Sequence, residues 1–453
     1  MNTNKDLKIV IVGAGPAGLS AAEALKEKGY TNITIIEKEL RVGGMSLSLS
    51  YPPNAEQNAK SLIYELGSIN IISSKNLYHL IEKHHLHLGK KSLGNLHNPN
   101  KPYYLKIYSL AQKKPLVDFT KYFSGLPACN SLAVFSDGLK LMAKMVKYRK
   151  LIQPGYHLSK EQIAELSIPY EQWVDEGNFR VMTNILKMFG SMGTFSDPAQ
   201  KNEIPAIHLI KYFFQLLHPP FRYINGSIKM MAEGYQELWK RIAKEHNVLT
   251  KQITRIIRSE SGVEIQFDDN NKLLADKLIV TCSPTQALKF LDVSVEEKQV
   301  FEKVHYSPGW RISFLAKNLP KDAFYAFYEP YMEPGYKPCL QSFYPEGQID
   351  DETWLYSAVI NYNKNDSLEE IKKDAEKIFQ EQFNGEVIQW LTQMYWPEYT
   401  PYFRCCDVKE GVYEKMNNLQ GVNNTYYSGG AFGGSSQAIV VDYSYDLINK
   451  YFE

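Results

Sequence analysis

Cysteine is scarce in this chain of 453 residues, and its placement argues against two kinds of structural cross-link. The five cysteines are odd in number and form no CxxC pair. A disulfide framework and a zinc site are therefore both unexpected. Three histidines cluster at His84, His85 and His87, but no second group of His, Asp or Glu accompanies them, and we expect no metal.

An excess of charge of one sign is also missing. Lys and Arg number 51 against 50 Asp and Glu, so the global charge does not indicate nucleic acid or another polyanion as a partner. Long apolar runs are lacking too. The most apolar window, Ile204–Phe221, is broken by histidines, a lysine and two prolines, which is not typical of a transmembrane span. With a polar N-terminus unlike a signal peptide, we expect a soluble, cytoplasmic protein.

Aromatic residues, by contrast, are abundant, with 31 tyrosines, 21 phenylalanines and 6 tryptophans. Such numbers suit a large apolar cavity, although ordinary core packing explains most of them. The length of the chain predicts two or three domains.

The clearest positive signal is a glycine turn near the N-terminus. An apolar run, Ile9–Val12, enters the turn, and residues 16–28 carry small and apolar side chains at helical spacing, which predicts a strand, a tight turn and a helix. In this setting Gly13 permits the turn, Gly15 lets the backbone approach a pyrophosphate, and Gly18 lets the helix pack on the strand. The free N–H groups at the helix start then face the phosphate charge.

A second strand, Ile33–Ile36, leads into Glu37, which lies 19 residues after Gly18. An acidic side chain at this point accepts hydrogen bonds from an adenosine ribose and disfavours a 2′-phosphate. Strand, turn, helix, second strand and acid stand in the order of a dinucleotide-binding unit. We therefore predict a dinucleotide site at this end of the chain.

The residues after Glu37 indicate which dinucleotide is bound. They resemble the acid-x3-R-x-G-G signature of the large flavoprotein superfamily that binds FAD in an extended pose. This resemblance implies that Gly43 and Gly44 approach the pyrophosphate from the other side and that Arg41 lies along the cofactor. The FAD-binding residues expected in this half of the site are Gly13, Gly15, Pro16, Ala17, Gly18, Glu37, Lys38, Arg41, Gly43, Gly44 and Met45.

Two middle segments resemble the amine oxidase superfamily of flavoproteins. By this resemblance a strand that ends at Leu66, Gly67 and Ser68 runs past the flavin, and the backbone of Ile253 meets the adenine edge. An ordinary buried strand would account for the same residues.

A glycine-rich turn near the C-terminus resembles the same superfamily. It runs from Gly429 to Ser436, and a helix is expected from Gln437. The resemblance places the pyrimidine edge of the flavin here, where the helix dipole would stabilise negative charge at N1 and O2. Gly430 stands where most relatives have an acid that binds the ribityl chain.

A narrower resemblance, to bacterial polyenoic fatty acid isomerases, covers most of the chain. It is carried by VGAGPAGLSAA, RVGG, YELGSI, IPAIHLIKYF, GVYEKMNNLQGVNNTYYSGG and DYSYDLINKYF. Such an isomerase uses FAD without net oxidation, because N5 takes hydride from a bis-allylic carbon and returns it to another carbon. It needs an apolar channel, exclusion of water and a basic anchor for the carboxylate.

The sequence offers fewer candidates for substrate binding. Many amine oxidases keep a lysine on the first strand after Val304, but the only basic residue between Ser307 and Ala316 is Arg311. This difference disfavours amine oxidation. Candidate anchors for a carboxylate are Arg311, Lys90, Lys91 and Arg222, and the predicted pocket residues are Tyr212, Phe213, Phe221 and Arg311. The three aromatic residues could equally form the face of a core helix.

The predicted fold is α/β, with a discontinuous Rossmann-like FAD-binding domain of the glutathione-reductase type, an inserted mixed-sheet substrate domain and a helical cap. We expect the FAD domain in residues 1–75, 224–285 and 405–453, the substrate domain in 76–130 and 286–404, and the cap in 131–223. Val248–Ile257 is expected to form one strand, and Leu132–Arg149 a solvated helix that is basic towards its end.

The predicted function is hydride transfer between a small lipophilic substrate, such as an unsaturated fatty acid, and N5 of FAD. Cys405 and Cys406 lie roughly where monoamine oxidases attach the flavin, but the spacing does not match, so we expect non-covalent FAD. Two alternatives stay open: a flavin amine oxidase that produces peroxide, and a catalytically silent FAD-binding interaction protein. The oligomeric state is not predicted.

Overall fold

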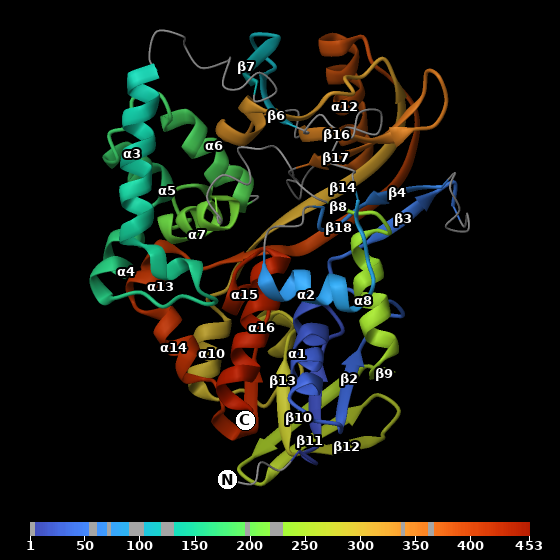
Figure 1. The fold of residues 1–453 in the computed structure, drawn as a ribbon, viewed down its shortest axis with the longest axis vertical. Coiled ribbons are helices and arrows are strands. Elements are labelled where there is room, and N and C mark those ends of the chain that lie inside the picture. Colours follow the sequence, from blue (N-terminus) through green and yellow to red (C-terminus); the bar gives the residue numbers. More distant parts are fainter. Residues whose placement is uncertain are drawn as a thin grey trace.

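The computed structural model describes residues 5–53, 61–69, 74–89, 104–118, 131–194, 200–217, 230–336, 340–360 and 367–453. Three groups of elements make up this part of the chain. A parallel sheet with its helices lies at the bottom of Figure 1, a larger mixed sheet lies at the top, and a group of helices lies beside both. The α/β class expected from the sequence is confirmed.

The parallel sheet has the strand order β19-β13-β1-β2-β9, and every neighbouring pair is parallel. Its central strand, β1, is buried along its whole length because helices and loops cover both faces of the sheet. The strands are β1 (Ile9–Val12), β2 (Ile33–Glu37), β9 (Asn247–Thr250), β13 (Lys277–Val280) and β19 (Thr425–Tyr427).

Four helices accompany this sheet: α1 (Pro16–Glu27), α2 (Lys75–Lys83), α8 (Tyr235–Lys244) and α16 (Gln437–Tyr451). The first and last of them pack together, and the Ser444 hydroxyl of α16 donates to the Ala17 carbonyl of α1 at 3.1 Å. The N-terminal and C-terminal helices are therefore direct neighbours.

The prediction of a single strand over Val248–Ile257 is wrong. The segment is divided between β9 of the parallel sheet and β10 (Ile253–Ser259) of a separate antiparallel sheet, which also contains β11 (Gly262–Phe267) and β12 (Lys272–Ala275). The Lys251 N–H donates to the Glu37 carbonyl at 2.9 Å and marks the last contact with β2. Beyond that bond the chain leaves the parallel sheet, a change that an apolar pattern alone does not encode.

The larger sheet has seven strands in the order β18-β14-β17-β16-β15-β6-β7. At its far edge, β6 and β7 form an antiparallel hairpin. The strands and the two helices that follow β15 and β17 are β6 (Tyr104–Ser109), β7 (Lys114–Asp118), β14 (His305–Lys317), β15 (Ala323–Phe327), α11 (Tyr328–Met332), β16 (Leu340–Gln348), β17 (Trp354–Ile360), α12 (Leu368–Phe383) and β18 (Glu386–Tyr402).

The helices beside the two sheets, which we call the helical cap, are α3 (Ser131–Lys147), the 3-10 turn η3 (Arg149–Ile152), α4 (Lys160–Leu166), α5 (Tyr170–Glu176), α6 (Thr183–Thr194) and α7 (Ala206–Leu217). The remaining elements are β3 (Ser48–Tyr51), β4 (Leu62–Glu65), β5 (Leu88–Gly89), β8 (Met230–Met231), α9 (Pro284–Ala287), α10 (Val295–Phe301), α13 (Cys405–Lys409), α14 (Val412–Asn418), η5 (Val422–Asn424) and α15 (Gly430–Gly433).

A buried carboxylate holds three elements around the parallel sheet together. Glu23 of α1 is fully buried and accepts hydrogen bonds from His246 Nε2 at 2.7 Å, Lys83 Nζ at 2.6 Å and His84 Nε2 at 3.4 Å. Burial alone would raise the pKa of Glu23, but the bonds from His246, His84 and Lys83 outweigh it and hold the pKa far below the usual range.

We expect Glu23→Gln to lower the free energy of unfolding by about 3 kcal/mol, because it leaves Lys83 without its counter-charge and the buried His84 and His246 rings without an ionised hydrogen-bond acceptor. Since the folded-state pKa of Glu23 is depressed, its contribution is present above the ordinary glutamate pKa and is lost as the pH falls. Urea unfolding of Glu23→Gln at neutral and acidic pH measures this. Glu27→Gln, at a partly exposed position of the same helix, is the control and should cost much less.

Candidate functional site

The first glycine turn connects β1 to α1 in the manner expected from the sequence. Gly13 has φ +105°, and a Cβ added there would lie 2.8 Å from Thr281 Oγ1. A Cβ at Gly18 would collide with the Gly13 carbonyl, so the helix packs on the turn only because Gly18 has no side chain. Gly15 is the N-cap of α1 and supplies no capping side chain. The first N–H groups of α1 are therefore left for another acceptor.

A second glycine pair lies against the first turn. Gly43 donates its N–H to the Ala14 carbonyl at 2.8 Å, and Gly43 and Gly44 have φ of +104° and +52°. A Cβ at Gly44 would lie 3.1 Å from the Gly15 Cα, and one at Gly15 would lie 3.6 Å from the Gly44 Cα. Two backbone segments without side chains thus face each other and form a cradle.

Glu37 ends β2 at the edge of this cradle. Its carboxylate accepts the Ala14 N–H at 2.8 Å and the Glu39 N–H at 2.9 Å. A carboxylate has about four acceptor positions, so capacity for further donors remains. Lys38 points to solvent and pairs loosely with Glu39. Ile253 is buried and begins β10 two residues after Lys251, whose N–H binds the Glu37 carbonyl.

The C-terminal glycine turn meets the N-terminal one. Gly429 has φ +111°, and a Cβ there would lie 3.1 Å from the Thr281 carbonyl oxygen. Ser436 caps α16 by accepting the Ile439 N–H, and Gln437 donates its side-chain amide to Ser46 Oγ. The two ends of the chain thus converge, which a single extended FAD requires.

The segment after β4 also reaches this place. A Cβ at Gly67 would collide with the Met45 carbonyl, and the Ser68 N–H donates to the same carbonyl at 3.2 Å. The Leu66 carbonyl accepts the Trp396 indole N–H at 2.7 Å, so β18 of the larger sheet joins the group. Arg41 lies over the Trp396 ring at 5.6 Å and donates to the Ser46 carbonyl.

Arg311 lies on β14, the strand next to β18, and β18 approaches the C-terminal turn at Pro401. Its side chain is buried, and its guanidinium lies 4.6 Å from the centre of the Tyr399 ring. Two residues beyond Tyr399 on β18, the Pro401 ring lies 3.1 Å from a Cβ added at Gly430. The charge of Arg311 also acts on Tyr331 and Tyr344, although burial outweighs it and raises the pKa of Tyr331 to about 12.

The predicted aromatic pocket residues are only partly placed. Tyr212 of α7 packs against Gly193 of α6, inside the helical cap. Phe213 belongs to α7, but its side chain lies outside the described residues, as do Phe221 and the alternative anchors Lys90, Lys91 and Arg222. The predicted channel wall therefore stays a prediction.

Lys211 is a buried residue that was not among the site residues predicted from the sequence. Its ammonium donates to the carbonyls of Leu151, Gln153 and Gly155, and its Cε lies 3.1 Å from a Cβ added at Gly434 of the C-terminal turn. Burial lowers the pKa of Lys211 to about 7. The signal that could have found it is a lone cation within the most apolar window of the chain.

In the described part of the chain, no group of three His, Cys, Asp or Glu side chains is arranged to hold a metal ion. His84, from the histidine cluster, pairs with Glu23 instead. Within the same residues, no helix combines the length and the apolarity that crossing a bilayer demands. Cys405 and Cys406 are free thiols at the start of α13.

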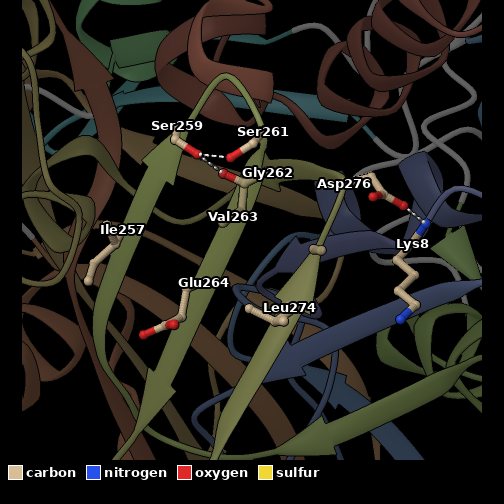
Figure 2. Close-up of a pocket in the computed structure, with 10 residues that line it drawn as sticks. Lys8, Ile257, Ser259, Ser261, Gly262, Val263, Glu264, Leu274 and Asp276 are labelled. Atoms are coloured by element: carbon tan, nitrogen blue, oxygen red, sulfur yellow. Dashed lines mark hydrogen bonds between the residues drawn. The ribbon is translucent and has the colours of Figure 1, made fainter.

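A surface hollow elsewhere does not belong to this site. Figure 2 shows it between the β10–β11 hairpin, with Ser259, Ser261 and Glu264, and the chain around Lys8 and Asp276. Lys8 precedes β1, so the hollow lies at the amino end of the parallel sheet. Nucleotides bind at the carboxyl ends of such strands, where both glycine turns lie.

Comparison with known proteins agrees with this geometry. The family described as flavin containing amine oxidoreductase matches residues 16–406, which is most of the chain. The chain belongs to this family. It is an FAD-dependent oxidoreductase.

Relatives and solved structures support the resemblance seen in the sequence. The FAD-dependent oxidoreductase dpchF of Colletotrichum higginsianum is 21% identical over 97% of this chain and 92% of its own length. A polyenoic fatty acid isomerase of Ptilota filicina is 52% identical over 46 residues, which is 10% of this chain and 9% of that protein. Among solved structures, the fatty acid isomerase from P. acnes superposes with a TM-score of 0.81, at 21% identity, over 99% of this chain and 100% of its own.

Putrescine oxidase in its wild-type form bound to putrescine has the same fold, with a TM-score of 0.71 and 15% identity over 98% of this chain and 99% of its own. At such identities these structures establish the fold and leave the substrate open. The residues of this chain fit the flavin cofactor of the family. Gly15 and Gly44 are only partly buried and carry no side chain that would keep a pyrophosphate from the backbone, and the buried Gln437 Oε1 has no hydrogen-bond partner among the described residues.

We expect Gly44→Ala to weaken FAD retention about tenfold, because the new methyl group narrows the cradle at a left-handed position. Gly29→Ala is the matched control. Gly29 also has a positive φ, but nothing lies within 4 Å of its Cβ position. Flavin absorbance after desalting, followed by FAD titration of the apoprotein, compares the two variants. Equal FAD affinity in both variants would show that the cradle is not part of the cofactor site.

We expect the stability of the protein to rise with pH between about 7, the lowered pKa of Lys211, and 10.5, the ordinary lysine value. In this window the unfolded chain binds a proton at Lys211 that the folded chain does not, so raising the pH favours folding. Lys211→Met should remove this part of the pH dependence. Urea unfolding of both proteins at several pH values measures the difference, and identical slopes would show that Lys211 keeps its ordinary pKa.

Proposed function

We propose that this oxidoreductase binds FAD non-covalently, acts in the cytoplasm, and transfers hydride to and from a C–H bond of a lipophilic carboxylic acid, such as an unsaturated fatty acid. The cofactor would lie between the two glycine turns, with its ribose at Glu37 and its pyrimidine edge near Gln437 at the start of α16. FAD supplies the hydride acceptor and donor. The residues of the chain hold the cofactor and exclude water from it.

One observation carries the choice of substrate class: a buried arginine contacts Tyr399, two residues before the point where β18 meets the C-terminal turn at Pro401. Arg311 is about 1% exposed and lies against Tyr399, and its charge acts on the nearby phenols of Tyr331 and Tyr344. A guanidinium binds a carboxylate through two parallel hydrogen bonds, and a buried one gains most from such a partner. A cation at this point suits a fatty acid better than an amine.

The surroundings of Tyr331 are consistent with an apolar tail. Its ring lies in a cluster with Ile107, Met188 and Ala326, from the larger sheet and from α6. The Ser191 hydroxyl of α6 also donates to the Tyr331 carbonyl at 2.8 Å. We propose that the substrate carboxylate binds Arg311 and that the tail extends along the contact between α6 and the sheet.

We expect Arg311→Met to lower kcat/KM for a polyunsaturated fatty acid by about tenfold to a hundredfold, mainly through KM, because a charged hydrogen bond to the carboxylate is lost. Arg311→Lys should restore part of it. For the methyl ester of the same acid, Arg311→Met should lower kcat/KM much less, since the ester has no carboxylate to bind the arginine. Arg255→Met, at an exposed position on β10, is the control and should leave the kinetics unchanged.

The reaction itself is tested by mixing the holoenzyme with fatty acid in the absence of oxygen. Formation of a conjugated diene without lasting loss of flavin absorbance supports isomerisation. Flavin bleaching by an amine, followed by peroxide when air is admitted, identifies an amine oxidase instead. Flavin that reacts with neither substrate class identifies a silent binding protein.

A further inference from the structure

The outer helix of the cap carries an apolar stripe that no described residue covers. Five large apolar side chains of α3 are half or more exposed, although isolated exposed apolar residues are the usual pattern on protein surfaces. These five, which we call the α3 stripe, are Leu132 (83%), Phe135 (66%), Leu139 (50%), Met142 (57%) and Val146 (57%).

The spacing of the stripe places it on a single side of the helix. Its members follow one another at intervals of three, four, three and four residues, which is the period of one helical face. At 1.5 Å per residue the stripe is about 21 Å long. The opposite face, with Ala133, Asp137 and Leu141, is buried on the side of the rest of the cap.

The position of α3 leaves the stripe facing outwards. Figure 1 shows α3 along the outer edge of the cap, with α5, α6 and α7 between it and the larger sheet. The sequence predicts a solvated helix here that is basic towards its end, and the structure has a helix with an exposed outer side. That exposed side carries the apolar stripe, which the prediction did not include.

The charges carried by α3 and by the turn that follows it are mostly basic. Between Ser131 and Ile152 there are five basic residues and one acid, Asp137, which gives a net charge of +4. Asp137 is buried and accepts the N–H groups of Arg180, Val181 and Met182, so it adds no negative charge to the surface. The five basic residues are Lys140, Lys144, Lys147, Arg149 and Lys150.

The basic residues are concentrated towards the C-terminal end of the stripe. Lys147 pairs with Glu165, whereas Arg149 and Lys150 are exposed and have no acidic partner among the described residues. Ile152, 42% exposed, adds one more apolar side chain beside them. The surface therefore combines apolar side chains with uncompensated positive charge.

These features discriminate between two occupants. A second copy of α3 would bury the stripe, but salt bridges along the flanks favour the pairing of such helices, and α3 itself has no exposed acid to form them. A bilayer with anionic headgroups supplies both an apolar layer for the stripe and negative charge for Arg149 and Lys150. We propose that α3 docks the protein on an anionic lipid surface, with its axis in the plane of the interface.

The proposal does not rest on the proposed reaction, because it concerns the outer face of the cap and can be tested without substrate. Failure of fatty acid turnover would leave it standing, and failure of lipid binding would leave the hydride chemistry standing.

The test is co-sedimentation of the FAD-loaded protein with lipid vesicles. One set of vesicles contains phosphatidylcholine with one-third phosphatidylglycerol, and the other contains phosphatidylcholine alone. We expect binding to the anionic vesicles that weakens with salt. The variant Phe135→Ser/Met142→Ser should bind about tenfold less, since membrane binding scales with the buried apolar area. Arg149→Glu/Lys150→Glu should lose the preference for anionic vesicles.

Leu274→Ser/Val295→Ser removes two apolar side chains of similar exposure, 62% and 68%, outside the cap and serves as the matched control. It should bind like the parent protein. Flavin absorbance and thermal unfolding establish that each variant is folded. Parent protein that stays in the supernatant with both kinds of vesicle overturns the proposal, as does equal binding by the Phe135→Ser/Met142→Ser variant. A dimer that this variant converts to a monomer, without vesicle binding by the parent, assigns the stripe to a second copy.

Discussion

Thr281 occupies the narrow space between the two glycine turns. The site depends on the close approach of Gly13 and Gly429 to this residue. Its hydroxyl donates to the Val12 carbonyl at 2.7 Å and lies beside Gly13, while its carbonyl lies beside Gly429. Because β1, β13 and β19 are parallel neighbours, their carboxyl ends meet at one edge of the sheet. This arrangement brings the first and last parts of the chain to the same place.

The larger sheet is attached to this edge through β18. Trp396 donates to the Leu66 carbonyl and lies under Arg41, and Pro401 packs on Gly430. The neighbouring strand β14 then places Arg311 against Tyr399, between these two contacts in sequence. Sheet pairing with β17 and β18 holds the backbone of Arg311 in place, and this makes a strand residue a suitable candidate for substrate binding.

Two buried networks of paired charges hold elements together elsewhere in the described residues. Arg258 of β10 binds Glu297 of α10 through two hydrogen bonds of 2.6 and 2.7 Å, and the Tyr427 hydroxyl of β19 joins the same carboxylate. Glu23 does the same for α1, α2 and the end of α8. Such networks are costly to break but specify which elements pack together. Lys211 differs, because carbonyl oxygens rather than a carboxylate surround its ammonium.

The sequence by itself determined the N-terminal nucleotide unit, because strand, glycine turn, helix and terminal acid are local features with fixed spacing. It also determined the family, since the motifs at both ends carry it. Only the tertiary structure decided where β9 ends and β10 begins, which face of α3 is exposed, and that Lys211 lies against Gly434. These depend on contacts between residues far apart in the chain. An apolar side chain has the same place in the pattern whether a neighbour covers it or not.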